Sequence, residues 1–223
     1  MIVVFDLDDT LYDERTYVKS ALMSVAKYLS ARIGRPLDKV FGRLEEILER
    51  DGRGKVFDTI LKEFGIYTRG EVQKCVTKYR TTDPEISLPQ VSIACLERFA
   101  SQPKYVVTDG NKMVQTKKIK ALGLQSFFKR TLPTHNFGVD KSKPSTYVFH
   151  KILSWEGALP QDLVYIGDNP RKDFVNLKKE GFNTIRVRTG MFAELRMTAE
   201  YEAHHEINSL AELDLHLLEG LFT

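Results

Sequence analysis

The stretch Val3-Val4-Phe5-Asp6-Leu7-Asp8-Asp9-Thr10-Leu11 decides how the rest of the chain is interpreted. Its first residues form an apolar run, rich in β-branched and aromatic side chains, that predicts a short buried strand. Asp6 and Asp8 follow two residues apart, a spacing that places both side chains on one side of an extended backbone. Carboxylates this close repel one another unless a cation or a proton lies between them. The stretch therefore predicts a strand that ends in an acidic cluster, either a solvated turn or a site for chemistry.

The composition is typical of an ordinary globular protein. The 223 residues are 42% hydrophobic and 28% charged, enough to bury a sizeable core. The formal net charge of +3 is too small to argue for nucleic-acid binding, although it suits an anionic substrate. We therefore expect no nucleic-acid partner.

Two further features bear on the cellular compartment. Cys75 and Cys95 lack the spacing of metal ligands, so we expect reduced and mostly buried thiols. The chain enters a strand at its first residues, which predicts that no signal peptide is present. No apolar run approaches the roughly 20 residues that span a bilayer. The sequence thus predicts a cytoplasmic protein without a membrane partner.

Helical periodicity follows the opening stretch. Apolar residues recur at helical spacing, and Gly or Pro clusters separate the segments. The expected helices cover residues 14–33, 37–50, 56–64 and 69–79. Because no segment here resembles a strand, we expect residues 14–83 to form a helical insert. Residues 1–13 and 84–223 would then form the main domain.

Strands and helices alternate in the rest of the chain. The expected strands after the first are residues 104–107, 130–133, 163–166 and 184–187, with a short last strand from about 205 to 207. The expected helices are residues 89–100, 114–122 and 145–153, one after Asp173, and a terminal helix opened by a capping-box pattern at Ser209. We expect the Lys117-Lys118 pair to lie on a solvated helix face. This alternation predicts an α/β fold with a parallel sheet and right-handed crossovers.

Polar residues follow the ends of these strands. Thr108-Asp109-Gly110 follows the second strand, and a loop that contains Lys141 and Lys143 follows the third. Gly167-Asp168 follows the fourth, with Asp173 five residues after Asp168. In an open parallel sheet the ligand lies at the carboxyl ends of the strands. We therefore expect these side chains to meet Asp6 and Asp8 at one edge of the sheet.

This ordered set resembles the four motifs of the haloacid dehalogenase-like (HAD) superfamily, whose members are mostly magnesium-dependent phosphatases. Motif I is matched by the stretch from Asp6 to Leu11, motif II by Thr108, the K-P-x-x-x-x-F form of motif III by Lys143 to Phe149, and motif IV by Asp168 and Asp173. The helical insert matches only in its position and helical character. The resemblance implies a Rossmann-like core with a helical cap that closes over the active site.

The resemblance also implies a role for each matched acid. Asp6 would be the nucleophile and Asp8 the general acid and base. Mg²⁺ would be held by Asp6, Asp168 and the backbone carbonyl of Asp8, and Asp173 would bind it directly or through water. These residue types suit the chemistry, because a carboxylate that attacks a phosphate needs a cation between the two.

The remaining matched residues would bind phosphate. The Thr108 hydroxyl and the backbone amides of Asp109 and Gly110 would donate to its oxygens, although Thr108 also fits a helix N-cap. The Asp109 carboxylate would repel phosphate, so we assign that residue only its amide. Lys143 would neutralise the phosphate and the nucleophile. Lys141 competes for that role, and the Lys-Pro context favours Lys143.

The expected function is a magnesium-dependent phosphatase that hydrolyses a small phosphomonoester through an aspartyl-phosphate intermediate. Alternatives are a phosphoglucomutase-like phosphotransferase, a dehalogenase of the same superfamily, a catalytically silent binding subunit and a receiver domain. Asp8 argues against dehalogenation, because that reaction needs no carboxylic acid two residues after the nucleophile. The helical insert argues against a receiver domain. The sequence indicates neither the natural substrate nor the oligomeric state.

Overall fold

The computed structural model describes residues 1–220 and divides the chain into two compact units. The first unit, which we call the sheet unit, comprises Met1–Glu14 and Ser87–Thr223. The second, the helical unit, comprises Arg15–Ile86. The helical unit is therefore inserted within the sheet unit, directly after the acid-rich stretch.

The sheet unit contains a six-stranded parallel sheet. Its strands are β1 (Ile2–Phe5), β2 (Lys104–Thr108), β3 (Arg130–Pro133), β4 (Leu163–Gly167), β5 (Asn183–Val187) and β6 (His205–Ile207), in the spatial order β3-β2-β1-β4-β5-β6. Val3 pairs with Lys104 on one side of β1 and with Val164 on the other. The strand order thus reverses between β1 and β4, where open parallel sheets bind their ligands. The predicted α/β fold is confirmed.

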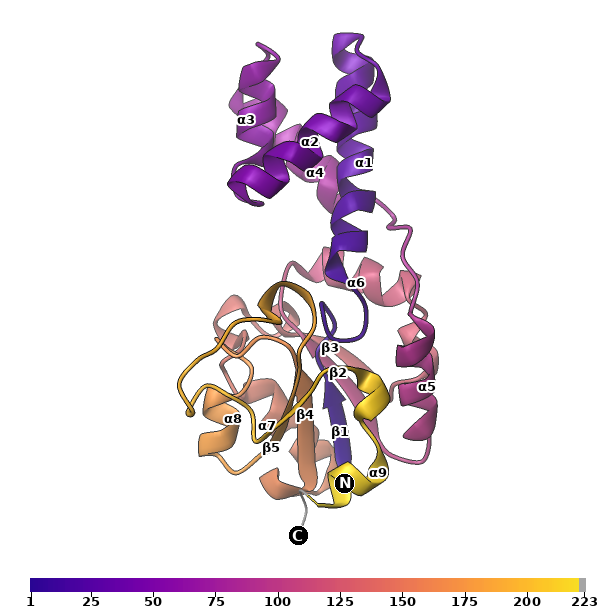
Figure 1. The fold of residues 1–223 in the computed structure, drawn as a ribbon, viewed down its shortest axis with the longest axis vertical. Coiled ribbons are helices and arrows are strands. Elements are labelled where there is room, and N and C mark those ends of the chain that lie inside the picture. Colours follow the sequence, from indigo (N-terminus) through magenta and orange to yellow (C-terminus); the bar gives the residue numbers. More distant parts are fainter. Residues whose placement is uncertain (221–223) are drawn as a thin grey trace. The chain divides into compact units, whose positions relative to one another are not determined.

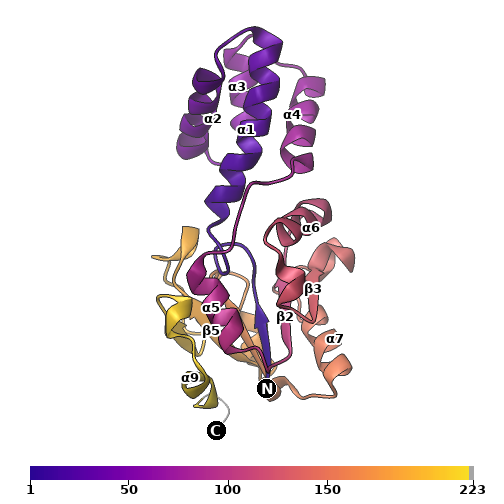
Figure 2. The same ribbon diagram turned by 90° about the vertical axis from the view of Figure 1, so that its right-hand side faces the viewer.

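Both faces of the central strands are covered, which explains their continuous apolar sequences. Ile2 and Val4 pack in one core with residues of α7 (Tyr147–Glu156) and α8 (Val175–Lys179). Helix α5 (Gln90–Arg98) lies on the opposite side of the sheet from α7 (Figure 2). The unit also contains α6 (Lys112–Ala121) and α9 (Leu215–Glu219), along with short 3₁₀ turns.

The helical unit has the four helices that the periodicity predicts (Figure 1). They are α1 (Glu14–Ile33), whose first residue belongs to the sheet unit, α2 (Leu37–Asp51), α3 (Val56–Glu63) and α4 (Arg69–Thr81). Val25, Leu29, Leu44 and Ile47 are fully buried and form part of its core. The end of α1 is set by Gly34, whose φ of 65° suits glycine.

Two expectations are wrong. Ser209 accepts a hydrogen bond from the Ala211 N–H but opens only a 3₁₀ turn, Leu210–Glu212, because Glu212 bonds the Asn208 N–H and leaves the capping box unclosed. The terminal helix α9 begins later, after Asp214. Lys118, expected on a solvated face, is only 2% exposed because it points toward carboxylates of the sheet unit.

Two further findings concern the cysteines and the lengths of the helices. Cys75 and Cys95 are free and buried, and burial raises the pKa of both thiols to about 11. Within residues 1–220, every helix falls short of the length and apolar character that crossing a membrane requires.

Candidate active site

Three of the predicted acids meet at the switch in strand order. Asp6 directly follows β1, and its N–H donates to the Ile166 carbonyl of β4 over 2.8 Å. Asp168 directly follows β4, so the two acids stand at neighbouring strand ends. Asp6, Asp168 and Asp173 each offer an oxygen that lies within 4.8 Å of the others, and all three residues are buried. We call these three residues the acid cluster.

One lysine enters the acid cluster. The Nζ of Lys143 lies 3.0 Å from Asp6 Oδ2, 2.8 Å from Asp173 Oδ1 and 2.6 Å from the Tyr165 hydroxyl. Its side chain is 1% exposed. Lys141, the competitor on the same loop, pairs with its neighbour Asp140 and keeps 35% of its side chain exposed. Of the two loop lysines, Lys143 is therefore the one in contact with the acids.

When all three are ionised, the acids of the cluster carry more negative charge than Lys143 balances. Burial raises the pKa of Asp6 to about 7, although the Lys143 ammonium opposes this effect. Burial, together with the neighbouring Asp173 and Asp6 carboxylates, raises the pKa of Asp168 to about 9. Burial alone would lower the pKa of Lys143, but these carboxylates raise it well above its usual range. A further cation would relieve this repulsion, and buried carboxylate oxygens are the ligands that Mg²⁺ prefers.

A glycine allows Asp173 to reach the cluster. The Asn169 N–H donates to Asp173 Oδ2 over 3.0 Å and fixes the turn after β4. A Cβ on Gly167 would lie 2.5 Å from that same oxygen. The glycine at the end of β4 is therefore required by the close approach of the carboxylate.

The predicted phosphate-binding residues lie after β2. Thr108 is 1% exposed, and Gly110 has a φ of 129°, in the region that favours glycine. The Asp109 carboxylate, which sequence reasoning set aside, accepts hydrogen bonds from the Lys143 N–H over 3.1 Å and from Lys172 Nζ over 2.8 Å. Burial would raise the pKa of Asp109, but the charges of Lys143 and Lys172 lower it. The Asp109 carboxylate is thus paired with lysines that follow β3 and β4.

Asp8 lies outside the acid cluster and is bonded to other side chains. Its Oδ1 accepts from Lys118 Nζ and from the Tyr12 hydroxyl, both over 2.7 Å. Its Oδ2 accepts from Gln115 Nε2 over 2.8 Å. We call Tyr12, Gln115 and Lys118 the Asp8 cradle.

The neighbouring Asp9 fixes the shape of the loop that carries Asp8. Its φ of 55° is rare for a residue with a side chain. Its Oδ1 accepts from the Glu14 N–H over 2.9 Å, and its Oδ2 accepts from the Met191 N–H over 3.1 Å. Thr189 donates its hydroxyl to the Asp9 carbonyl. These bonds offset the strain of the backbone and tie the acid-rich loop to the segment after β5.

Sequence reasoning missed several residues at this site. Lys172, Tyr165, Gln115 and Lys118 all contact predicted site residues. Gln115 and Lys118 stand three apart, which places them on one face of a helix. Residues on a solvated helix face can have the same spacing, so the spacing alone could not identify these two residues as part of a site.

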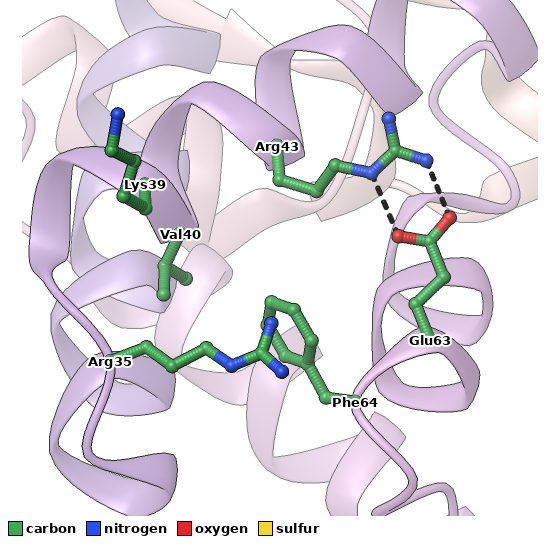
Figure 3. Close-up of a pocket in the computed structure, with 6 residues that line it drawn as sticks. All are labelled: Arg35, Lys39, Val40, Arg43, Glu63 and Phe64. Atoms are coloured by element: carbon green, nitrogen blue, oxygen red, sulfur yellow. Dashed lines mark hydrogen bonds and ion pairs between the residues drawn. The ribbon is translucent and has the colours of Figure 1, made fainter.

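A hollow also lies within the helical unit, apart from the residues that the sequence predicted (Figure 3). It measures about 320 Å³ and is lined by Arg35, Lys39, Val40, Arg43, Glu63 and Phe64. Arg43 is already paired with Glu63 through two hydrogen bonds of 2.7 and 2.6 Å. The residues that line this hollow include no acid pair of the kind found in the sheet unit.

Known proteins with similar sequences are phosphatases. The chain is 29% identical over 218 residues to the glyceraldehyde 3-phosphate phosphatase of Methanocaldococcus jannaschii, covering 95% of this chain and 94% of that protein. It is 27% identical over 227 residues to the protein of the same name from Pyrococcus furiosus, covering 98% and 92%.

Solved structures show the same fold. The HAD-hydrolase YfnB of Bacillus subtilis, bound to magnesium, matches with a TM-score of 0.67 at 22% identity and covers 97% of both chains. The HAD phosphatase of Thermococcus onnurineus matches with a TM-score of 0.58 at 24% identity, covering 95% and 94%. The 2-haloacid dehalogenase of Pseudomonas syringae matches with a TM-score of 0.66 at 20% identity and full coverage.

A family model supplies the remaining comparison. It is described as haloacid dehalogenase-like hydrolase and matches residues 3–187, most of the chain. The matched region includes the whole acid cluster, Lys143 and Asp8. This chain is therefore an enzyme that belongs to the haloacid dehalogenase-like hydrolase family.

Proposed function

We propose that the protein is a magnesium-dependent phosphatase that hydrolyses a small phosphomonoester through an aspartyl-phosphate intermediate. The observation that carries this proposal is the buried acid cluster with Lys143 at the switch in strand order. The names of the relatives support a phosphorylated small metabolite as substrate, and glyceraldehyde 3-phosphate is the first compound to test. The magnesium in the similar YfnB structure supports the choice of metal.

The reaction has two steps, with proton transfers assigned to Asp8. Asp6 attacks phosphorus, the bond to the leaving oxygen breaks, and Asp8 gives that oxygen a proton. Water then attacks the phosphorus of the aspartyl phosphate, Asp8 takes a proton from it, and Asp6 is regenerated as inorganic phosphate forms. Lys143 stabilises the negative charge beside Asp6 throughout.

The metal and the phosphate would be bound by the residues at the strand ends. Asp6, Asp168 and the Asp8 carbonyl would hold Mg²⁺, and Asp173 would do so directly or through water. A bound Mg²⁺ would supply positive charge that lowers the repulsion between the Asp6 carboxylate and a phosphate. The Thr108 hydroxyl and the amides of Asp109 and Gly110 would donate to the phosphate.

The rival activity within the family is dehalogenation, since a 2-haloacid dehalogenase has the same fold. Asp8 favours the phosphatase, because its carboxylate is held by three side chains although dehalogenation has no need of it. Phosphate transfer between hydroxyl groups would use the same residues and remains the second candidate.

Phosphate release in the presence and absence of metal tests the proposal. With Mg²⁺, the purified protein should release phosphate from an aryl phosphate and from glyceraldehyde 3-phosphate. Phosphate release should stop in excess chelator. Ca²⁺ should inhibit, because its looser and higher coordination spoils the in-line geometry. Asp168→Asn should remove activity, whereas Asp140→Asn should keep it because the Asp140 side chain is 73% exposed. Full activity in chelator would refute the metal role, and halide release from a 2-haloacid would favour the dehalogenase.

We also propose that the helical unit acts as the cap of the family and sets substrate selectivity. Deleting residues 16–79 and joining the ends with a short linker should change the ranking of substrates more than it changes turnover of an aryl phosphate. A folded deletion variant with an unchanged substrate profile would show that the helical unit is scaffolding.

A further inference from the structure

We propose that Gln115 and Lys118 of α6 are positioning residues that hold the Asp8 carboxylate for both proton transfers. This proposal rests on the function proposed above and extends it to residues that no motif of the family resemblance included. It is carried by the contacts of the Asp8 cradle and by the burial of both side chains.

Both oxygens of Asp8 are fixed by the cradle. Lys118 and Tyr12 donate to Oδ1 over 2.7 Å each, and Gln115 donates to Oδ2 over 2.8 Å. A carboxylate held at both oxygens cannot rotate freely about its terminal torsion. Proton transfer needs the carboxyl group within hydrogen-bond reach of the reacting oxygen, so its orientation bears directly on the rate.

The burial of Lys118 shows that its contacts are specific. Its side chain is 2% exposed and also lies 3.1 Å from Glu14 Oε1. A buried ammonium group is costly unless carboxylates surround it, and an apolar side chain would fill the same space at less cost. A lysine at this place is therefore better explained by the acid that it contacts than by packing.

Gln115 connects Asp8 to the phosphate-binding loop. Its Nε2 lies 2.8 Å from Asp8 Oδ2, 2.7 Å from Thr108 Oγ1 and 2.9 Å from the Asp109 carbonyl. Gln115 is 1% exposed, so water does not compete for these contacts. One amide thus sets the position of the proposed proton carrier relative to the residues proposed to bind phosphate.

The test compares two substrates in the full-length protein with Mg²⁺. In Lys118→Met we expect kcat for an alkyl phosphate to fall about 10- to 100-fold while its KM changes less than about threefold, because the proton carrier is misaligned. An aryl phosphate needs no proton for its leaving oxygen, so transfer to Asp6 should continue while hydrolysis of the intermediate slows. An adduct about 80 Da heavier, one phosphoryl group, should then accumulate after an acid quench. With an alkyl phosphate, whose leaving oxygen needs a proton, kcat should fall but no adduct should accumulate, because the first step is slowed.

Control variants separate positioning from folding. Lys120→Met changes an exposed lysine of the same helix and should behave as wild type. Lys118→Arg keeps a cationic donor and should recover part of kcat and reduce the adduct. If Lys118→Met does not fold, Gln115→Met and Tyr12→Phe should reproduce the adduct, since they remove neutral donors from the same carboxylate and leave no unpaired charge.

Two results would overturn the proposal. A folded Lys118→Met enzyme with unchanged kcat, or with equal losses on both substrates and no adduct, would show that the cradle serves packing alone. A wild-type protein that releases no phosphate with Mg²⁺ would overturn the proposed function, and this inference with it. An active wild type with an unaffected cradle variant would overturn only the inference.

Discussion

Lys143 of the sheet unit and Arg43 of the helical unit are both cations bonded to two carboxylates, but their surroundings differ. Lys143 is 1% exposed and lies between Asp6 and Asp173. The Arg43 side chain is 32% exposed and pairs with Glu63 and Glu46 on the surface of its helices. The same kind of contact is thus made in dry surroundings in one unit and in water in the other.

The difference in exposure suggests that the buried charges of the acid cluster serve function and the exposed ion pairs of Arg43 do not. Exposed ion pairs are screened by water and contribute little to stability, so we expect the Arg43 pairs to add little to the free energy of unfolding. Buried charges cost desolvation that their attraction often fails to repay. The acid cluster carries three carboxylates around one lysine, an arrangement that raises the pKa of Asp6 and Asp168 and is poor for stability. Its presence is better explained by the cation and the phosphate that we propose it binds.

The largest expected effect comes from Asp6, the proposed nucleophile. Asp6→Asn should lower turnover by roughly 10⁴-fold or more, because no carboxylate remains to form the intermediate. Asp8→Asn keeps size and hydrogen bonding but cannot carry a proton, so with an aryl phosphate it should accumulate the adduct of about 80 Da. Intact-mass measurement after an acid quench should find the adduct in Asp8→Asn and not in Asp6→Asn. Normal turnover by Asp8→Asn, or an adduct in Asp6→Asn, would mean that the two roles are wrongly assigned.

The next largest effect is expected from removing Lys143, and removing Arg43 is the comparison. Lys143→Met should lower kcat/KM about 10²- to 10³-fold, because the charge beside Asp6 is no longer stabilised. Arg43→Met should leave kcat/KM within about twofold and the melting temperature within about 2 °C of wild type. Lys141→Met is the matched control on the active-site loop and should resemble Arg43→Met. If Lys141→Met lost activity and Lys143→Met did not, the assignment of the loop lysine would be reversed.

The smallest effect concerns stability of the metal-free protein against pH. The pKa of Asp6 rises from 3.8 to about 7 on folding, and that of Asp168 rises from 3.8 to about 9. Between about pH 4 and pH 9 the folded state therefore binds protons that the unfolded state has released. The free energy of unfolding must then fall as pH rises through this window.

Thermal melting in chelator measures this dependence. The melting temperature should drop by on the order of 10 °C between about pH 6 and pH 8.5, and Mg²⁺ should restore it at the higher pH. Asp168→Asn should weaken the dependence, because it removes the carboxyl group with the larger shift. A metal-free protein that grows more stable over the same range would contradict the raised pKa of the cluster.

Much of the fold could be predicted because it depends on local patterns. The apolar run of β1 and the Leu163–Ile166 run of β4 predict buried parallel strands. Because parallel strands end at the same edge of a sheet, Asp6 and Asp168 were expected at that edge, and the pairing of β1 with β4 brings them close. That inference needed only the direction of the strands and not the position of any side chain.

The Asp8 cradle could not be predicted for the opposite reason. Lys117 and Lys118 are adjacent in α6, and only the packing of that helix decides which of them faces carboxylates. The capping-box prediction at Ser209 was wrong for a similar reason, because Glu212 accepts a hydrogen bond from the Asn208 N–H and not from that of Ser209. Side-chain direction on a helix is a tertiary property, and the sequence pattern leaves it open.

The central position of β1 also bears on the order in which the chain can fold. Val3 lies at the start of the chain, yet it pairs with Val164, which is synthesised long after the helical unit. The helical unit is one continuous segment and can form its contacts as soon as it is made. Strand β1, which Asp6 follows, can pair with β2 earlier, but its pairing with β4 is non-local and must wait until β4 is made. A chain that stops before β4 would leave one edge of β1 unpaired, so the strand that leads into Asp6 is a site where aggregation during synthesis can begin.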